Sequence, residues 1–356
     1  MRNLNHISAE KILALNVPES LFSKSSAQAK QEYRTLVRRW HPDIERSSNA
    51  SRVFAHIAHL YGLARKKLYD GTWNEPPEKT EEEVAGQRKF KTLGGETKSI
   101  NYDVAHPFEL GTMYVSDHSV TFEVQSEYKD LFRNGRKRIR ELKFQNRAMA
   151  LEMGSCLPQI VDSYRTQESS LLVIRKTPDQ LLLADVATHF GGQLIPEHVG
   201  WILNALYNIC CYLQWSGITH NAMSLDTVFV SPLRHSGMPL GGWWYAAAVD
   251  KELLAVPDKT LPFIPPDVLR NKRADTRVDL ELIKSIGRAL LGDAVGAHLV
   301  LDKSFPPKLI QWLRLPSSGC AADDYRDWKY EVLENCFGRP RFLKLPLDSE
   351  VLYKEK

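Results

Sequence analysis

The chain has 356 residues and 43% hydrophobic content, enough for two or three domains with cores of their own. Its net charge of +4 is too small to indicate nucleic-acid binding, and no apolar run reaches the roughly 18 residues that cross a bilayer. The five cysteines form no Cys-x-x-Cys pair, which argues against a zinc site or a disulfide scaffold. This cysteine usage makes a reducing cytoplasm the expected location, and the first residues lack the apolar segment of a signal peptide.

A helical hairpin is predicted near the start of the chain. Ser26 offers a hydroxyl that can cap a helix, and apolar residues then recur at three- and four-residue spacing as far as Trp40. Pro42 ends this helix, because it lacks a backbone N–H and pushes His41 out of helical geometry. A second amphipathic helix follows from about Ser51.

The first of these helices also has a basic face. Lys30, Arg34 and Arg38 recur every four residues, away from the apolar stripe, and Arg39 follows. Like charges at this spacing repel one another weakly, so helix propensity alone does not favour them. By itself the run is as expected for a solvated face.

The hairpin resembles the J-domain of the DnaJ family. The resemblance rests on a short leading helix from Ala9 to Leu15, the register Ala29-Lys-Gln-Glu-Tyr-Arg34, the run Trp40-His-Pro-Asp43, and Tyr61 in the following helix. It implies that residues 1–73 dock on a DnaK-type chaperone (heat shock protein 70 family) and stimulate its ATP hydrolysis. The chaperone-binding residues that it implies are His41, Pro42, Asp43, Lys30, Tyr33, Arg34, Arg38 and Arg39.

The rest of the chain begins with a predicted polar linker over residues 74–98, which are charged, contain proline and lack an apolar period. Strands followed by helices then predict an α+β domain. The expected elements are strands at 114–115, 120–124 and 171–174, basic helical sequence over 128–153, and a long apolar helix over 196–215.

The order of elements over residues 99–345 resembles the bilobal protein-kinase fold, with 346–356 as a C-terminal tail. The anchor is the run Gly217-Ile-Thr-His220 to Thr227, which follows the long apolar helix as the catalytic loop does in kinases. On the kinase pattern, His220 stands at the motif His, Ala222 at the catalytic Asp and Thr227 at the metal-binding Asn.

The residues that phosphoryl transfer requires are missing from this pattern. The reaction needs magnesium ligands, a carboxylate that orients the attacking hydroxyl, and a Lys–Glu pair that holds the phosphates. Ala222 cannot accept a proton, Thr227 is a poor metal ligand, and Leu240-Gly-Gly-Trp-Trp-Tyr245 replaces Asp-Phe-Gly. The domain is therefore predicted to be a pseudokinase with no catalytic residue and no metal site, and without a cofactor, although ATP binding stays open.

Structural roles are expected for the other notable residues of this domain. His220 is predicted to hold its loop, Asp279 to accept hydrogen bonds from backbone, and the aromatic run 243–245 to pack in the core rather than form a stacking platform. Asp226 and Asp250 are expected to be surface carboxylates rather than metal ligands. The candidates for a strand lysine and its partner are Lys137 or Lys143 with Glu152.

Three hypotheses follow for the function. The first is a J-domain co-chaperone that is not itself an enzyme, in which the kinase-like domain recruits an unknown client or partner protein. The second is an atypical but active ATP-dependent transferase that is regulated or targeted through the J-domain. The third is a scaffold with a vestigial J-domain, against which the retained Tyr33, Arg34 and Trp40-to-Asp43 run argues. Neither a membrane nor a nucleic acid is an expected partner.

Overall fold

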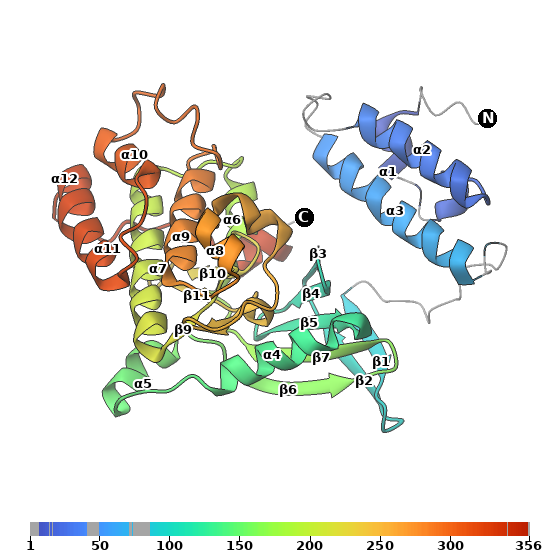
Figure 1. Ribbon diagram of the computed structural model, residues 1–356, viewed down its shortest axis with the longest axis horizontal. Coiled ribbons are helices and arrows are strands. Elements are labelled where there is room, and N and C mark those ends of the chain that lie inside the picture. Colours follow the sequence, from blue (N-terminus) through green and yellow to red (C-terminus); the bar gives the residue numbers. More distant parts are fainter. Residues whose placement is uncertain are drawn as a thin grey trace. The chain divides into compact units, whose positions relative to one another are not determined.

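The computed structural model describes residues 7–13, 15, 17–40, 50–70, 73, 86–339 and 341–354. The chain divides into two compact units, Met1–Glu83 and Val84–Lys356. The described part of the first unit is helical, whereas the second combines helices with antiparallel sheets (Figure 1). The α+β class predicted for the second part is confirmed.

The first unit is built on two long helices that lie alongside each other (Figure 1), as the apolar periodicity predicted. A short helix, α1 (Ala9–Leu13), precedes α2 (Ser26–Arg39) and α3 (Ala50–Asp70). Ser26 is the first residue of α2 and not its cap; Ser25 holds that position without a side-chain capping bond. The buried apolar residues of the three helices and their connections form one core: Ile12, Leu21, Phe22, Ala29, Leu36, Trp40, Val53, Ile57, Leu60, Ala64 and Trp73.

The second unit contains a five-stranded antiparallel sheet in the order β3-β4-β5-β7-β6. Alternate residues of its central strand, such as Val120, Phe122 and Val124, are buried in the main core. The helical sequence after β5 forms two helices separated by residues 141–146, and α4 packs against the sheet (Figure 1). The elements are β3 (Val104–Phe108), β4 (Gly111–Val115), β5 (Ser119–Gln125), α4 (Lys129–Arg140), α5 (Arg147–Gly154), β6 (Ile160–Arg165) and β7 (Ser169–Arg175).

Part of the predicted linker is instead a β-hairpin that belongs to the second unit. Strands β1 (Gln87–Lys91) and β2 (Thr97–Asn101) pair antiparallel within the predicted linker range 74–98 and just beyond it. Phe90 packs on Tyr164, with ring centroids 5.4 Å apart, and Tyr102 packs on Tyr114 at 4.9 Å. Because these aromatic contacts join the hairpin to the sheet, its polar residues form the solvated side of a packed element.

The helical part of the second unit is organised around α7 (Pro196–Ser216), which packs against α9 (Thr276–Leu290) and α11 (Ala321–Asp327). The long apolar helix predicted from residue 196 is confirmed, and residues on most of its circumference are buried. The other elements are β8 (Leu181–Leu182), α6 (Leu183–His189), β9 (Ile218–Thr219), β10 (Val228–Ser231), β11 (Ser236–Pro239), η4 (Trp243–Tyr245), β12 (Ala247–Ala248), η5 (Asp258–Phe263), α8 (Pro266–Asn271), α10 (Pro307–Arg314), η6 (Trp328–Leu333) and α12 (Glu334–Phe337).

The C-terminal segment predicted to be a tail is also packed. It contains a π-helical turn, η7 (Glu350–Lys354), in which Leu352 and Tyr353 are buried. The hydroxyl of Tyr353 accepts a hydrogen bond from the backbone N–H of Leu182 (3.1 Å). The Lys354 ammonium pairs with Asp117 in the β4–β5 turn (2.8 Å). The segment therefore belongs to the second unit.

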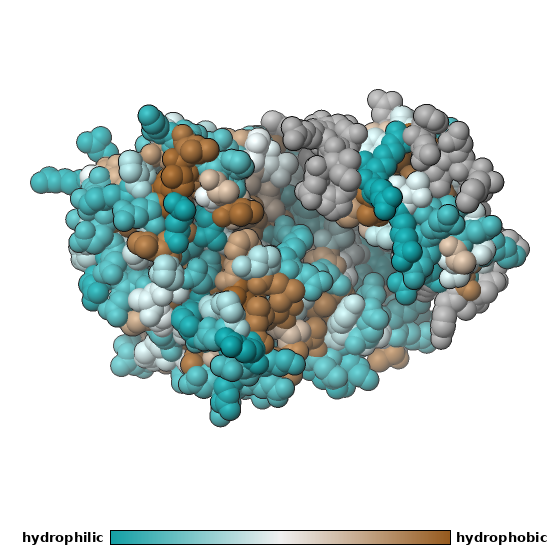
Figure 2. All heavy atoms as spheres, turned by 45° about the horizontal axis from the view of Figure 1, so that its top comes forward, coloured by the Kyte–Doolittle hydropathy of each residue, from teal (hydrophilic) through white to brown (hydrophobic). Residues whose placement is uncertain are grey.

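Exposed apolar side chains occur on the surface of the second unit. Figure 2 shows groups of brown, hydrophobic side chains there, set among hydrophilic ones. Val295 and Leu301, between α9 and α10, are 79% and 77% exposed. Exposed apolar residues are common on folded proteins, so these carry no functional conclusion by themselves.

Candidate functional site

The candidate site of the first unit is the basic face of α2. Lys30, Arg34 and Arg38 are all exposed, and their four-residue spacing places them on one side of the helix. Within the described part of the chain none of the three forms an ion pair. The face therefore carries three positive charges that are open to a partner.

Two other residues predicted for this site are held by neighbouring aromatic rings. The ring of Tyr33 stacks on that of Tyr61 in α3, with centroids 4.1 Å apart and planes inclined by 8°. The guanidinium of Arg39 lies 5.1 Å from the ring centroid of Trp40. Tyr33 thus fixes α2 on α3, and only part of its side chain is accessible.

The tripeptide His41, Pro42 and Asp43 lies outside the described residues, which resume at Ala50. The flanking residues are packed: Trp40 is 6% exposed and Ala50 is 2% exposed. The backbone N–H of Trp40 also donates to the carbonyl of Leu36 at 2.9 Å. The basic helix therefore ends at an anchored residue directly before the tripeptide.

In the second unit, one buried carboxylate holds the loop after β9 through hydrogen bonds to its backbone. The two oxygens of Asp279, in α9, accept hydrogen bonds from the backbone N–H groups of His220 and Asn221, each at 2.7 Å. Asn221 adopts the left-handed conformation (φ 63°), and its amide donates to the carbonyl of Tyr245 at 2.9 Å. The backbone-binding role predicted for Asp279 is confirmed.

His220 has no access to solvent and contacts only neighbouring protein groups. Its Nε2 lies 2.9 Å from the carbonyl oxygen of Gly241, so that nitrogen carries the proton and donates it. The other nitrogen, Nδ1, is buried and has no partner among the described residues. Burial lowers the pKa of His220 to about 4, because protonation would bury a second N–H without an acceptor. The imidazole is therefore neutral at pH 7 and links two segments of backbone.

Asp279 shows the opposite shift for the same reason. Burial raises the pKa of its carboxyl to about 7, although the two backbone N–H donors act to lower it. The group lies beneath the loop and has no exposed edge, since its residue is 1% exposed. A perturbed pKa here reflects a structural anchor.

The other residues of this loop satisfy one another. Ala222 is 1% exposed and carries only a methyl group. The hydroxyl of Thr227 donates to the carbonyl of Ala222 (2.7 Å) and accepts from the backbone N–H of Ser224 (2.9 Å). The oxygen of Thr227 thus closes the turn, and the structure brings no ionisable side chain into the positions of Ala222 and Thr227.

The segment at residues 241–246 closes over this loop. The rings of Trp243 and Trp244 are 0% and 2% exposed, which confirms the predicted core packing. Trp244 meets Phe122 of β5 edge to face at 5.1 Å. The side-chain amide of Asn134, in α4, donates to the carbonyls of Trp244 and Ala246 at 2.9 and 2.8 Å. These contacts tie the segment to both β5 and α4.

The lysines proposed for a strand position are placed elsewhere, so that expectation is wrong. Lys137 lies in α4 with its side chain 65% exposed, and Lys143 lies in the following connection with its ammonium over the ring of Trp215. Glu152 is exposed in α5.

Asp226 and Asp250 are both exposed, as expected of surface carboxylates. Asp226 pairs with Lys259 at 2.6 Å, and Asp250 is exposed. Across the described residues, no group of three or more His, Cys, Asp or Glu side chains could hold a metal ion.

Two polar clusters were not found from the sequence. Lys176 is buried after β7, where its ammonium donates to the carbonyls of Asp117 and Thr177, and burial lowers its pKa to about 8. Arg136 and Arg140 line a groove beside β6. The basic run after residue 128 was visible in the sequence, but which of its side chains line the groove depends on the tertiary structure.

Comparison with protein-family models and with curated proteins gives no match to this chain. None of the helices that the structure describes combines the length and the apolar character needed to cross a membrane.

Proposed function

We propose that this protein is a J-domain co-chaperone whose first unit binds a DnaK-type chaperone and stimulates its ATPase. In this proposal the second unit is a catalytically degenerate, kinase-like domain that recruits a client or partner protein. The observation that carries the proposal is the exposed basic face of α2, which ends at the anchored Trp40 directly before His41, Pro42 and Asp43.

The charge distribution supports a docking role for α2. Exposed charges without intramolecular partners keep their full field for an approaching protein and raise the rate of association with an acidic surface. Lys30, Arg34 and Arg38 are exposed and have no ion-pair partner among the residues that the structure describes. The J-domain would act by binding the hydrolysis-competent state of the chaperone more tightly than the other state, which shifts the population toward hydrolysis.

The composition of the sheet and its helix supports the assignment of the second unit as a pseudokinase. In kinases, a lysine of the third strand pairs with a glutamate of the following helix to hold the nucleotide phosphates. Strand β5 is the third strand of the five-stranded sheet in chain order, and its sequence, SVTFEVQ, has no lysine. Helix α4, KDLFRNGRKRIR, has no glutamate. The polar groups of the loop over Asp279 likewise form hydrogen bonds that hold the loop in place.

The test is single-turnover ATP hydrolysis by a bacterial DnaK, measured with the full chain and with His41→Gln. We expect the wild type to accelerate hydrolysis and His41→Gln to give the rate of DnaK alone, because the tripeptide is the implied switch. Arg34→Glu combined with Arg38→Glu should weaken stimulation by about tenfold or more, with the larger loss at low salt.

Arg65→Glu is the matched control, since it reverses an exposed charge on α3. It should change stimulation by less than about twofold, within the range of exposed-charge effects. If His41→Gln accelerates ATP hydrolysis as much as the wild type does, the tripeptide is not the switch. A loss of equal size with Arg65→Glu would mean that α2 is not the docking face.

The alternative, an atypical ATP-dependent transferase, predicts magnesium-dependent ATP binding and autophosphorylation. Asp226 would be the carboxylate to test first, because it lies in the loop between Ala222 and Thr227. We expect no phosphate transfer. If the chain phosphorylates itself and Asp226→Asn abolishes that activity, the pseudokinase assignment is wrong and the chain is an active transferase.

A further inference from the structure

The second unit concentrates positive charge in one segment. Residues 129–147 contain eight lysines and arginines against two carboxylates, Asp130 and Glu141, whereas the whole chain has a net charge of only +4. The rest of the chain is therefore slightly acidic, and α4 with the connection after it forms a local basic surface.

Several of these charges have partners on the same helix. Arg133 pairs with Asp130 at 3.1 Å, while Lys137 and Arg138 both pair with Glu141, at 3.7 and 2.9 Å. Arg136 and Arg140 differ, because neither forms an ion pair within the described part of the chain. Their four-residue spacing puts them on one face of α4.

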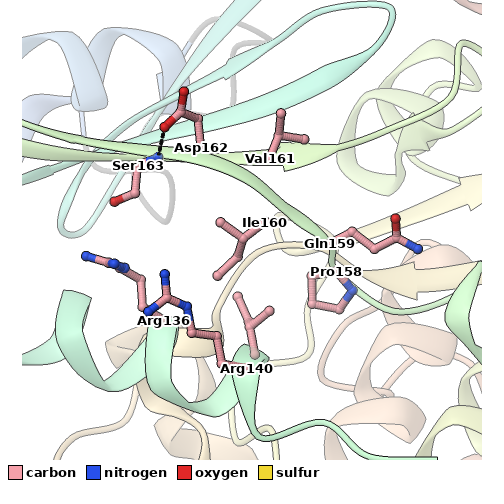
Figure 3. Close-up of a pocket in the computed structure, with 9 residues that line it drawn as sticks. Arg136, Arg140, Pro158, Gln159, Ile160, Val161, Asp162 and Ser163 are labelled. Atoms are coloured by element: carbon pink, nitrogen blue, oxygen red, sulfur yellow. Dashed lines mark hydrogen bonds between the residues drawn. The ribbon is translucent and has the colours of Figure 1, made fainter.

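These two arginines face a groove between α4 and β6 with a volume of about 520 Å³. Ile139 of α4, Pro158 and Ile160 supply apolar walls. In Figure 3, Arg136 and Arg140 rise from α4 toward the strand, and the side chain of Ser163 points down toward them. The groove has the size of a ligand site, and its lining is mainly polar with a smaller apolar part.

Two polar atoms in this groove are buried without a partner among the described residues: the Nε of Arg136 and the Oγ of Ser163. Asp162 does not neutralise the arginines. Its carboxylate points away from them in Figure 3 and accepts hydrogen bonds from the backbone N–H of Ser163 and the hydroxyl of Tyr164. Burial and the neighbouring charges of Arg140 and Arg165 lower the pKa of Arg136, as expected for cations gathered without an anion.

We propose that this groove binds a phosphorylated segment of a partner protein, with the phosphate held by Arg136, Arg140 and Ser163. Guanidinium groups bind phosphate through paired, charge-assisted hydrogen bonds, and a serine hydroxyl adds one more donor. Ile139, Pro158 and Ile160 would contact the residues beside the phosphate. A nucleic acid fits less well, because none of the described residues that line the groove has an aromatic side chain to stack on a base.

The test uses the full chain and a short fluorescein-labelled peptide with one phosphoserine between leucine residues, compared with the same peptide carrying unmodified serine. Fluorescence anisotropy should give at least about tenfold tighter binding of the phosphorylated peptide, and inorganic phosphate should compete for it. Arg140→Gln and Arg136→Gln should each weaken binding about tenfold, and Ser163→Ala should weaken it less.

Arg133→Gln and Lys137→Gln are matched controls, because each removes one charge from an exposed side chain of the same helix. They should alter binding by less than about twofold. Arg136 packs over the ring of Phe132, so the Arg136→Gln variant could unfold. Arg140 is exposed, and Arg140→Gln then tests the groove by itself.

Equal binding of the two peptides, or equal losses with the control variants, would overturn the proposal. So would binding confined to a single-stranded oligonucleotide or to vesicles that contain phosphoinositides. The groove lies in the second unit, so peptide binding can be measured whether or not the chain stimulates a chaperone.

Discussion

The polar residues of the two candidate sites differ in their exposure and in their hydrogen bonding. On α2, Lys30, Arg34 and Arg38 point into solvent without an ion-pair partner in the described part of the chain. Around β9, by contrast, Asp279, His220 and Asn221 are almost completely buried and hydrogen-bond one another's segments. Under the proposed function the exposed charges serve recognition of a partner, whereas buried polar groups that satisfy backbone serve stability. Substitutions should therefore affect partner binding at the first site and folding at the second.

The largest effect is expected from Asp279→Ala. It leaves two buried backbone N–H groups without an acceptor and removes the link between α9 and the loop, which should cost about 3–5 kcal/mol of unfolding free energy. Urea unfolding of the full chain, followed by hydrogen exchange of amides at residues 218–227 and 276–290, reports on this unit. Asp226→Ala is the control, since its partner Lys259 is 74% exposed, and it should cost less than about 1 kcal/mol. Similar costs for the two variants would contradict an anchoring role for Asp279.

The second effect concerns the contact between the loop and the segment at 241–246. Gly242 has φ of +79°, and an added Cβ would lie 2.8 Å from Cε1 of His220 and 3.0 Å from Cβ of Ala222. Gly242→Ala should therefore cost about 2–4 kcal/mol through backbone strain and crowding. Gly217→Ala separates the two causes, because Gly217 has φ of +75° with nothing within 4 Å of its added Cβ. The control should cost only about 1–2 kcal/mol, and equal costs would show that the close packing is unimportant.

The elements with strong apolar periods could be predicted from the sequence. Each of these elements buries a continuous stripe or face, and the spacing of its apolar residues predicts that stripe directly. They are the helices on both sides of Trp40, the strands around Val120 and Leu172, and the long helix from Pro196. The role of Asp279 as a hydrogen-bond acceptor for backbone was also predicted from the sequence.

The β1–β2 hairpin and the C-terminal turn could not be predicted in the same way. Strand β1 buries only Phe90, so it shows almost no alternation, and its stability comes from contacts with residues more than 60 positions away, such as Tyr164. Leu352 and Tyr353 pack on a distant part of the chain near Leu182. In the groove beside β6, the sequence gives eight basic residues but not which of them face the strand. Contacts between segments distant in sequence decide all three cases.

The smallest effect, a dependence of stability on pH, tests whether His220 is held neutral. Its pKa in the folded chain, about 4, is below its ordinary value of 6.5, so at intermediate pH the unfolded chain binds more protons than the folded one. The stability that His220 contributes is present above about pH 6.5 and is lost as the pH falls toward about 4. Gln can donate to the carbonyl of Gly241 and does not titrate, so the stability of wild type relative to His220→Gln isolates this term. Asp279, whose raised pKa acts in the opposite direction, contributes to both chains and cancels in the difference.

Between about pH 7 and pH 5.5, the wild type should lose about 1 kcal/mol of unfolding free energy relative to His220→Gln. Urea unfolding at the two pH values, read by the same hydrogen exchange, measures this difference. If the stability difference between wild type and His220→Gln stays constant with pH, His220 has the same pKa in the folded and unfolded chains. The buried Nδ1 without a partner among the described residues argues against that outcome. A difference that grows in favour of the wild type at low pH would mean that the imidazole is charged in the folded chain and finds an acceptor there. The loop would then resemble α2, with a charge held for a partner, and the contrast between the two sites would fail at this residue.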